Sequence, residues 1–136
     1  MTYTVSRRVR FAHCDPAAIV FFPRYFEMIN SVVEDWFSDV IGTGFNRMHQ
    51  ELGVGVPTAS LQTDFTAPSR LGEELVFSLR PRKIGGSSLQ LDIEAHCGEE
   101  LRLRNRSTLV YVDMTTGRPL AWPETMRQQF TQLLED

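Results

Sequence analysis

The sequence has little cysteine, no marked excess of charge of either sign and no long hydrophobic run. Two cysteines are too few for a disulfide framework, so Cys14 and Cys97 are expected to be free thiols in a reducing compartment. A net charge of −3 gives no support for a nucleic-acid surface. No stretch approaches the ~20 apolar residues that span a bilayer, and residues 1–8 lack the apolar segment of a signal peptide. We therefore expect a cytoplasmic protein that binds neither nucleic acid nor membrane.

The chain does contain enough apolar sequence for one folded domain. A chain of 136 residues buries ~68% of the surface that its unfolded form exposes, so a core forms without metals or disulfides. The sequence shows no internal repeat and no low-complexity tract. Residues 1–136 are therefore expected to form a single domain.

A long helix is the main element predicted in the first third of the chain. Residues 3–11 alternate as a half-buried strand, and Asp15-Pro16 predicts a tight turn. Proline is favoured at the first helical position, so the helix is expected to run from Pro23 to about Ile41. Its apolar positions cover about half the circumference. They are Phe22, Tyr25, Phe26, Met28, Ile29, Val32, Val33, Trp36, Phe37 and Val40. Such a wide arc predicts burial by a sheet that curls around the helix, or by one sheet face plus a partner subunit.

The rest of the chain predicts antiparallel strands. Period-two alternation marks strands over residues 59–65, 73–83, 88–97 and 101–112. Gly85-Gly86 predicts a hairpin in which the paired glycines take positive φ. Residues 46–52 predict a short helical turn, and Pro123 begins a final helix. The expected fold is α+β, with an antiparallel sheet of about five strands, one long helix and a short C-terminal helix.

Residues 13–26 carry a resemblance to a known family. Their sequence, His-Cys-Asp-Pro-Ala-Ala-Ile-Val-Phe-Phe-Pro-Arg-Tyr-Phe, closely resembles the signature of the 4-hydroxybenzoyl-CoA thioesterase family. The resemblance extends more weakly over nearly the whole chain, through the strand order and the Gly-Gly-Ser-Ser hairpin at 85–88. It implies a hotdog fold, in which the sheet wraps the central helix. It also implies a homodimer with active sites at the subunit interface, commonly paired again into a tetramer.

The same resemblance implies the catalytic residues. Asp15 matches the aspartate that acts on the thioester carbonyl as nucleophile or base, and the backbone N–H of Phe22 matches the donor that polarises the thioester oxygen. Unpaired N–H groups at a helix start favour negative charge, and one well-placed donor contributes ~3 kcal/mol. A carboxylate that is ionised at neutral pH favours nucleophilic attack through a mixed anhydride, whereas burial would favour activation of water. His13 is a third candidate, which could position Asp15 or a water.

Two departures from the family pattern concern backbone conformation and nucleotide binding. Ala18 stands where the family has glycine, which asks for an ordinary backbone conformation there. Gly85-Gly86-Ser87 stands where some relatives carry basic residues for the CoA nucleotide. Replacement phosphate ligands are Arg82 and Lys83 or the row Arg102, Arg104 and Arg106, although such a row also describes the solvated face of a strand. The candidate substrate-binding residues are Tyr25, which could equally be a packing residue, Arg82, Lys83 and Ser88.

The expected activity is hydrolysis of an acyl-CoA thioester to a free acid and CoA. A 4-hydroxybenzoyl-like aromatic acyl group follows from the resemblance alone. No metal or redox cofactor is expected, and CoA enters only as part of the substrate. A Cys14 thiolate nucleophile and a metal site from His13, Asp15, His96 and Cys97 are weaker alternatives, because neither has a supporting spacing. Two functional alternatives are an acyl-carrier-protein thioesterase and a non-catalytic module that binds an acyl group or small ligand.

Overall fold

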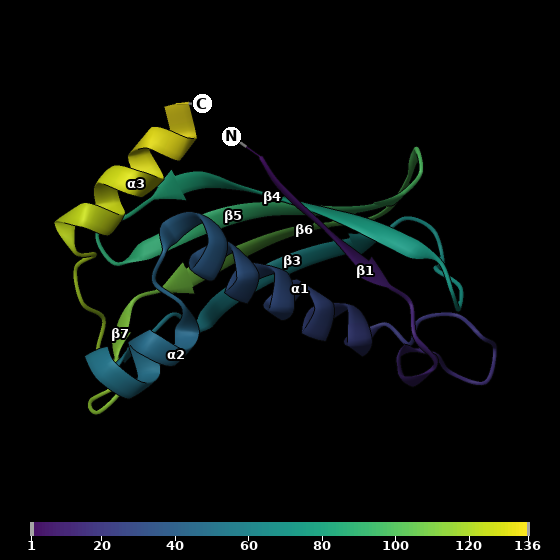
Figure 1. Ribbon diagram of the computed structural model, residues 1–136, viewed down its shortest axis with the longest axis horizontal. Helices are drawn as coiled ribbons and strands as arrows, with labels where there is room; N and C mark the ends of the chain where they lie inside the picture. The colour runs from purple at the N-terminus through teal and green to yellow at the C-terminus, as the bar shows by residue number, and fades with distance from the viewer. Residues whose placement is uncertain (1, 136) are drawn as a thin grey trace.

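The computed structural model describes residues 2–135 and shows a curved antiparallel sheet packed against one central helix (Figure 1). The two ends of the predicted domain, Met1 and Asp136, lie outside the described residues. The main sheet has five strands in the order β1-β4-β5-β6-β3. They are β1 (Tyr3–Arg8), β3 (Thr58–Phe65), β4 (Glu74–Ile84), β5 (Ser88–Cys97) and β6 (Glu100–Val110). The predicted α+β class and five-stranded sheet are confirmed.

Shorter elements complete the chain around this sheet. Strands β2 and β7 pair in a small ladder of their own. The remaining elements besides the central helix are the 3₁₀ helix η1 (Phe11–His13), the π-helical segments η2 (Phe37–Ile41) and η3 (Met48–Leu52), α2 (Phe45–Arg47), β2 (Val54–Gly55), β7 (Val112–Asp113) and α3 (Glu124–Glu135). The C-terminal helix α3 lies at the end of the sheet where β4 finishes, opposite the loops that precede the central helix (Figure 1). The predicted C-terminal helix is therefore confirmed.

The central helix α1 (Pro23–Trp36) is shorter than predicted as a regular α-helix. It has 14 residues, and η2 continues it in π-helical form to Ile41, where Gly42 ends it with a φ of 82°. Pro23 occupies the first turn, as predicted from its missing N–H. No helix among residues 2–135 is long and apolar enough to cross a lipid bilayer.

The apolar arc of α1 is buried unevenly by the sheet. Tyr25, Val32 and Trp36 are buried against the inner face, where Phe77 and Ile93 are fully enclosed. Phe26 and Val40 are half-buried, and Phe22, just before the first helical residue, keeps 56% of its surface exposed. The curved sheet therefore buries most of the arc, which favours the first of the two predicted modes of burial, and the start of the helix stays open.

Strand β3 is an exposed edge of the sheet. It pairs with β6 on one side only, and nearly all of its residues are exposed. Leu61 and Phe65 keep 49% and 43% of their surface open. An edge strand with apolar side chains is a ready site for pairing with another chain.

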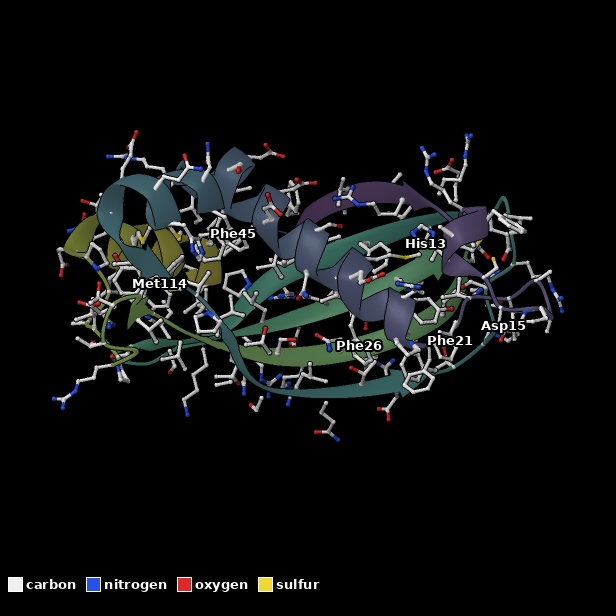
Figure 2. The ribbon with its side chains drawn as sticks, turned by 90° about the horizontal axis from the view of Figure 1, so that it is seen from below. His13, Asp15, Phe21, Phe26, Phe45 and Met114 are labelled. Carbon is white, nitrogen blue, oxygen red and sulfur yellow. The ribbon has the colours of Figure 1, made fainter. Side chains whose placement is uncertain are left out.

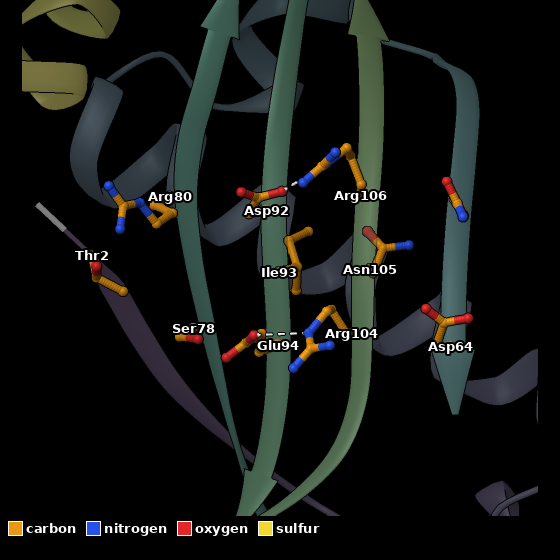
Figure 3. Close-up of a pocket in the computed structure, with 11 residues that line it drawn as sticks. Thr2, Asp64, Ser78, Arg80, Asp92, Ile93, Glu94, Arg104, Asn105 and Arg106 are labelled. Carbon is orange, nitrogen blue, oxygen red and sulfur yellow. Dashed lines mark hydrogen bonds and ion pairs between the residues drawn. The ribbon is translucent and has the colours of Figure 1, made fainter. Parts of the chain in front are cut away.

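The outer face of the sheet is covered by charged pairs (Figure 3). Arg106 donates to Asp92 at 3.0 Å and Arg104 donates to Glu94 at 3.3 Å. Arg82 lies 3.4 Å from the same Asp92. These exposed pairs occupy three of the cations that the sequence offered as phosphate ligands, namely Arg82, Arg104 and Arg106.

The predicted hairpin after β4 is present, with different turn geometry. Gly85 N–H donates to the carbonyl of Ser88 at 2.9 Å and closes the connection to β5. Among the glycines of residues 2–135, those with positive φ are Gly42, Gly53, Gly72, Gly98 and Gly117. The predicted positive φ at Gly85 and Gly86 is therefore wrong. Glycine still suits position 85, because a Cβ there would lie 2.3 Å from Ser88 Oγ and the serine side chain would have to move.

Candidate active site

The loop between η1 and α1 folds back on itself. Cys14 and Val20 form an antiparallel bridge, and Asp15 N–H donates to the carbonyl of Ile19 at 3.0 Å. Phe21 N–H donates to the carbonyl of His13 at 2.9 Å. Asp15 and the residues that start α1 therefore lie on neighbouring arms of one loop.

Asp15 sits at the turn of this loop. Its Oδ1 accepts the N–H of Ala17 at 2.8 Å, and its carbonyl accepts the N–H of Ala18 at 2.9 Å, which is the turn predicted for Asp-Pro. No donor within residues 2–135 is bonded to Oδ2 of the half-buried carboxylate. Asp15 borders a cavity of about 330 Å³ with apolar walls that include Phe11 and Leu71. One carboxylate oxygen therefore holds the loop, while the other is available to a substrate.

The backbone N–H of Phe22 lies at the start of α1. The carbonyls of Phe21 and Phe22 accept the N–H groups of Arg24 at 2.8 Å and Tyr25 at 3.1 Å, which fixes the first turn. No described carbonyl or side chain accepts the Phe22 N–H itself, so it is available to an oxyanion. Phe22 borders a cavity of about 530 Å³, which is separate from the one beside Asp15. The fold-back thus places both groups on one loop, but within a single chain they line different cavities.

Ala18 adopts the left-handed conformation, with a φ of 62°. The expected ordinary conformation is therefore wrong. The reason lies in the loop, because Ala18 donates its N–H to Asp15 and its carbonyl accepts the N–H of Leu71 at 3.3 Å. Both bonds require the chain to reverse at this residue. The left-handed region favours glycine, which is the residue that the family has at this position.

A second loop, residues 66–73, supports the first. Val20 N–H donates to the carbonyl of Ser69 at 2.9 Å, and Ile19 pairs with Arg70. This supporting loop also bonds the chain just before η1, since Val9 N–H donates to the carbonyl of Glu73 at 2.8 Å. The position of the Asp15 loop therefore depends on the supporting loop.

Arg102 anchors the supporting loop from within. Its guanidinium donates to Glu73 at 2.8 Å and 3.1 Å and to Ser69 Oγ at 3.2 Å, and its Nε lies 2.7 Å from Glu100. Arg102 is only 7% exposed. The paired guanidinium lowers the pKa of Glu73 to about 2, and Glu73 in turn raises the pKa of Arg102. The buried ion pair is therefore charged at neutral pH.

Arg102 is buried, so it does not belong to the predicted row of exposed arginines. Ala95 pairs with Leu103 and His96 pairs with Leu101, so Arg102 has no partner on β5. This bulge inserts one extra residue in β6 and re-aims its side chain, as bulges do. The sequence named Arg102 only as a candidate phosphate ligand, and its role in anchoring the supporting loop was missed. The alternation of apolar and polar residues along a strand does not reveal a bulge, so the sequence could not predict where Arg102 points.

Tyr25 and His13 mainly hold the loops in place. The Tyr25 hydroxyl donates to Ser69 Oγ at 2.8 Å, and burial raises its pKa. The His13 Nδ1 accepts the N–H of Arg10 at 2.9 Å, which leaves only Nε2 for another partner. Burial lowers the pKa of His13, so its imidazole is neutral at pH 7. A neutral ring with one free nitrogen can still bond a substrate or water.

The other candidate substrate-binding residues lie far from Asp15 of the same chain. β4 begins beside the supporting loop and runs 11 residues to the hairpin, which spans roughly 33 Å at ~3.3 Å per residue. Arg82, Lys83 and Ser88 are at that distant end (Figure 1). Within one chain they cannot reach a substrate held by Asp15.

Comparison with known proteins places this geometry in a family. The model of the thioesterase-like superfamily matches residues 9–130. The 1,4-dihydroxy-2-naphthoyl-CoA hydrolase of Nostoc punctiforme is 23% identical over 128 residues, which cover 94% of this chain and 86% of that protein.

Solved structures share the fold. The 1,4-dihydroxy-2-naphthoyl-CoA thioesterase of Synechocystis superposes with a TM-score of 0.87 at 21% identity, covering 98% of both chains. A Staphylococcus aureus protein solved with CoA gives 0.90 at 17% identity, covering 99% of this chain and 85% of that one. These comparisons confirm the hotdog fold, while 4-hydroxybenzoyl specificity stays a prediction. The chain belongs to the thioesterase-like superfamily.

Proposed function

We propose that this thioester hydrolase cleaves an aromatic acyl-CoA, with Asp15 as the nucleophile and the Phe22 N–H as the oxyanion donor. The observation that carries the proposal is the folded-back loop, which leaves one oxygen of Asp15 and the N–H of Phe22 without partners among residues 2–135. The aromatic acyl group is supported by the names of the relatives, which act on 1,4-dihydroxy-2-naphthoyl-CoA. The 4-hydroxybenzoyl thioester is the second substrate to compare.

The reaction then follows from the two groups. Asp15 Oδ2 attacks the thioester carbon, and the carbonyl oxygen becomes an oxyanion that the Phe22 N–H stabilises. Collapse of this intermediate breaks the C–S bond, releases the CoA thiolate, which takes up a proton, and leaves a mixed anhydride on Asp15. Water hydrolyses the anhydride and restores the carboxylate. If Asp15 acts as a base instead, the water attacks the thioester directly and no anhydride forms.

A homodimer through β3 would complete the site. The exposed edge of β3 and an aromatic cluster beside it support this assembly, since Phe65 contacts Phe22, Tyr25 and Phe26 with ring centroids 5.4–6.1 Å apart. Antiparallel pairing of two β3 strands would join two sheets and cover this surface. A dimer of such dimers is the assembly that the resemblance implies. The free thiols of Cys14 and Cys97 fit the reducing cytoplasm in which we place the enzyme.

The decisive experiment is Asp15→Asn, measured by release of free thiol from a panel of aromatic and aliphatic acyl-CoAs. Asparagine keeps an oxygen for the Ala17 N–H and removes the charge, so the fold should survive while kcat falls by about 10³-fold or more. Glu99→Gln, in the exposed turn between β5 and β6, is the matched control, with kcat unchanged. Unchanged turnover in Asp15→Asn would refute the assignment. Incorporation of ¹⁸O from water into Asp15 over many turnovers separates the anhydride from the base mechanism.

A further inference from the structure

Two exposed pairs of residues, each an arginine followed by a large apolar residue, flank the cavity beside Asp15. Phe11 and Leu71 both line this cavity of about 330 Å³, and Arg10 and Arg70 directly precede them in the sequence. Phe11 keeps 83% of its surface exposed and Leu71 keeps 47%. Both arginines are exposed as well. We call these four residues the rim of the cavity.

The backbone holds the two halves of the rim together. Val9 N–H donates to the carbonyl of Glu73 at 2.8 Å, and Gly72 N–H donates to the carbonyl of Val9 at 2.9 Å. These two bonds join the segments that carry the two halves of the rim. Leu71 N–H donates to the carbonyl of Ala18 at 3.3 Å and ties the rim to the loop that carries the reacting carboxylate. Main-chain hydrogen bonds therefore fix the rim relative to that carboxylate.

The two arginines of the rim are unpaired. Among residues 2–135, the arginine and lysine side chains that form no hydrogen bond or ion pair are Arg10, Arg70, Arg80, Lys83 and Arg118. Arg80 and Lys83 lie on the half of β4 that leads to the hairpin. Arg118 follows the turn that carries Met114, at the end of the molecule opposite Asp15 (Figure 2). The rim therefore holds the unpaired cations at the Asp15 end.

The carboxylates beside the rim are already paired. Glu73 accepts from Arg102 at 2.8 Å, and Glu74 accepts from Arg8 at 2.8 Å. In the two loops the unpaired charges other than Asp15 are therefore those of the rim arginines. Guanidinium groups bind phosphate through two N–H donors, and planar bases stack on aromatic rings. Two free arginines beside an exposed phenyl ring thus suit a ligand that carries phosphates and a base.

We propose that Arg10 and Arg70 bind the phosphates of the CoA moiety, and that the ring of Phe11 stacks on its adenine. This inference rests on the proposed thioesterase function, which places the thioester at Asp15. The apolar walls of the cavity face the pantetheine arm, which joins the thioester to the phosphates. The rim thereby supplies the phosphate ligands for which the sequence offered only strand and hairpin cations.

The hairpin is the competing location for the nucleotide. Arg82 is already paired with Asp92, and Lys83 lies at the distant end of β4 in the same chain. Lys83 therefore reaches a substrate at Asp15 only from a partner subunit. Lys83→Gln is the variant that distinguishes this location from the rim.

The first test compares two thioesters of one acyl group, 4-hydroxybenzoyl-CoA and 4-hydroxybenzoyl-pantetheine, the second of which lacks the phosphates and the adenine. Arg10→Gln and Arg70→Gln should each raise KM for the CoA thioester about tenfold at unchanged kcat, because the phosphates are bound equally before and during the reaction. Neither variant should change kcat/KM for the pantetheine thioester. Arg80→Gln removes an exposed unpaired arginine elsewhere and is the control.

Three outcomes of this comparison overturn the inference. Unchanged KM in both rim variants would show that the arginines do not bind the substrate. Equal losses for the two thioesters would show that they only shape the loops. A KM that rises in Lys83→Gln and in neither rim variant would place the nucleotide at the hairpin.

The second test measures binding without turnover, by calorimetric titration of CoA into Asp15→Asn protein. Adding Arg10→Gln and Arg70→Gln together should weaken Kd about 10²-fold, and adding Phe11→Leu about fivefold or more. Added salt should weaken CoA binding by Asp15→Asn protein and have little effect once both arginines are replaced. Unchanged binding in these variants refutes the phosphate site alone. Full turnover by Asp15→Asn, with binding that still depends on the rim, refutes the proposed function and leaves the phosphate site standing.

Discussion

The two ends of α1 are built differently. At the start of the helix, the Asp15 loop and the supporting loop are joined by backbone hydrogen bonds and tied to the sheet by the buried Arg102–Glu73 pair. From Glu27 onward, α1 borders a larger cavity of about 810 Å³ with exposed Met114 at its edge, where Glu34 has no partner among residues 2–135. A reacting carboxylate needs a fixed position, because a displacement of about 1 Å costs ~10²-fold in rate. The anchored end therefore suits the proposed chemistry of Asp15, and the open end does not.

Disrupting the proposed dimer through β3 should give the largest loss of activity. Leu61 lies in the middle of β3 and is 49% exposed, so Leu61→Lys should leave the monomer folded while it places a charge in the proposed dimer interface. We expect a monomer in sedimentation and a loss of about 10³-fold in kcat/KM, which corresponds to ~4 kcal/mol. Val76→Lys is the control, because Val76 is also an exposed apolar residue but lies on β4, which is paired on both sides within the sheet. A fully active monomer would show that one chain contains both halves of the site.

Loosening the anchored start of α1 should give the second-largest effect. Arg102→Met removes one partner of a buried pair and leaves Glu73 without its cation, so the free energy of unfolding in urea should fall by about 3 kcal/mol. At temperatures where the variant is folded, kcat should fall more than KM changes, because the Asp15 loop loses its support. Arg104→Met breaks only the exposed pair with Glu94 and should cost less than about 0.5 kcal/mol. Equal losses in the free energy of unfolding for the two variants would show that Arg102 does not anchor the start of α1 more firmly than an exposed pair does.

Acid should weaken the anchored end selectively. The pKa of Glu73 is lowered from 4.5 to about 2 by Arg102, so the pair stabilises the fold above pH 4.5 and this stabilisation disappears as the pH falls towards 2. Because Glu73 is 28% exposed, solvent screening reduces the expected loss to about 2 kcal/mol. Urea unfolding at pH 6, 4 and 2.5 measures the loss. Glu73→Gln should show a shallower decline over the same range, and parallel curves would disprove this role of the pair.

The sequence predicted the anchored end better than the open one. Asp-Pro and Pro23 specify local geometry, so the turn, the helix start and the strand order followed from residue types and periodicity. The anchoring role of Arg102 did not follow, because it depends on a bulge in β6. The cavity of about 810 Å³ did not follow either, because its walls come from segments far apart in the chain. The π-helical end of α1 was read as α-helix, since both conformations place apolar residues on a similar face. The alternation of apolar and polar residues does not encode the register between distant strands. Features that depend on this register could therefore not be predicted, whereas local turns and helix starts could.

The smallest effect should come from the turn of the Asp15 loop. Ala18 has a φ of 62°, which costs a residue with a Cβ about 1–2 kcal/mol, and Ala18→Gly removes this cost. Glycine also raises the entropy of the unfolded chain, which offsets about 0.4–1 kcal/mol of the gain. Because Ala18 is exposed and bonds only through its backbone, no packing is lost, and a net stabilisation of about 0.5 kcal/mol remains. Ala17→Gly, at an exposed neighbour without positive φ, has only the entropic term and should destabilise by a similar amount. Urea unfolding of the pair therefore tests the sign, and two destabilised variants would show that the left-handed turn stores no strain.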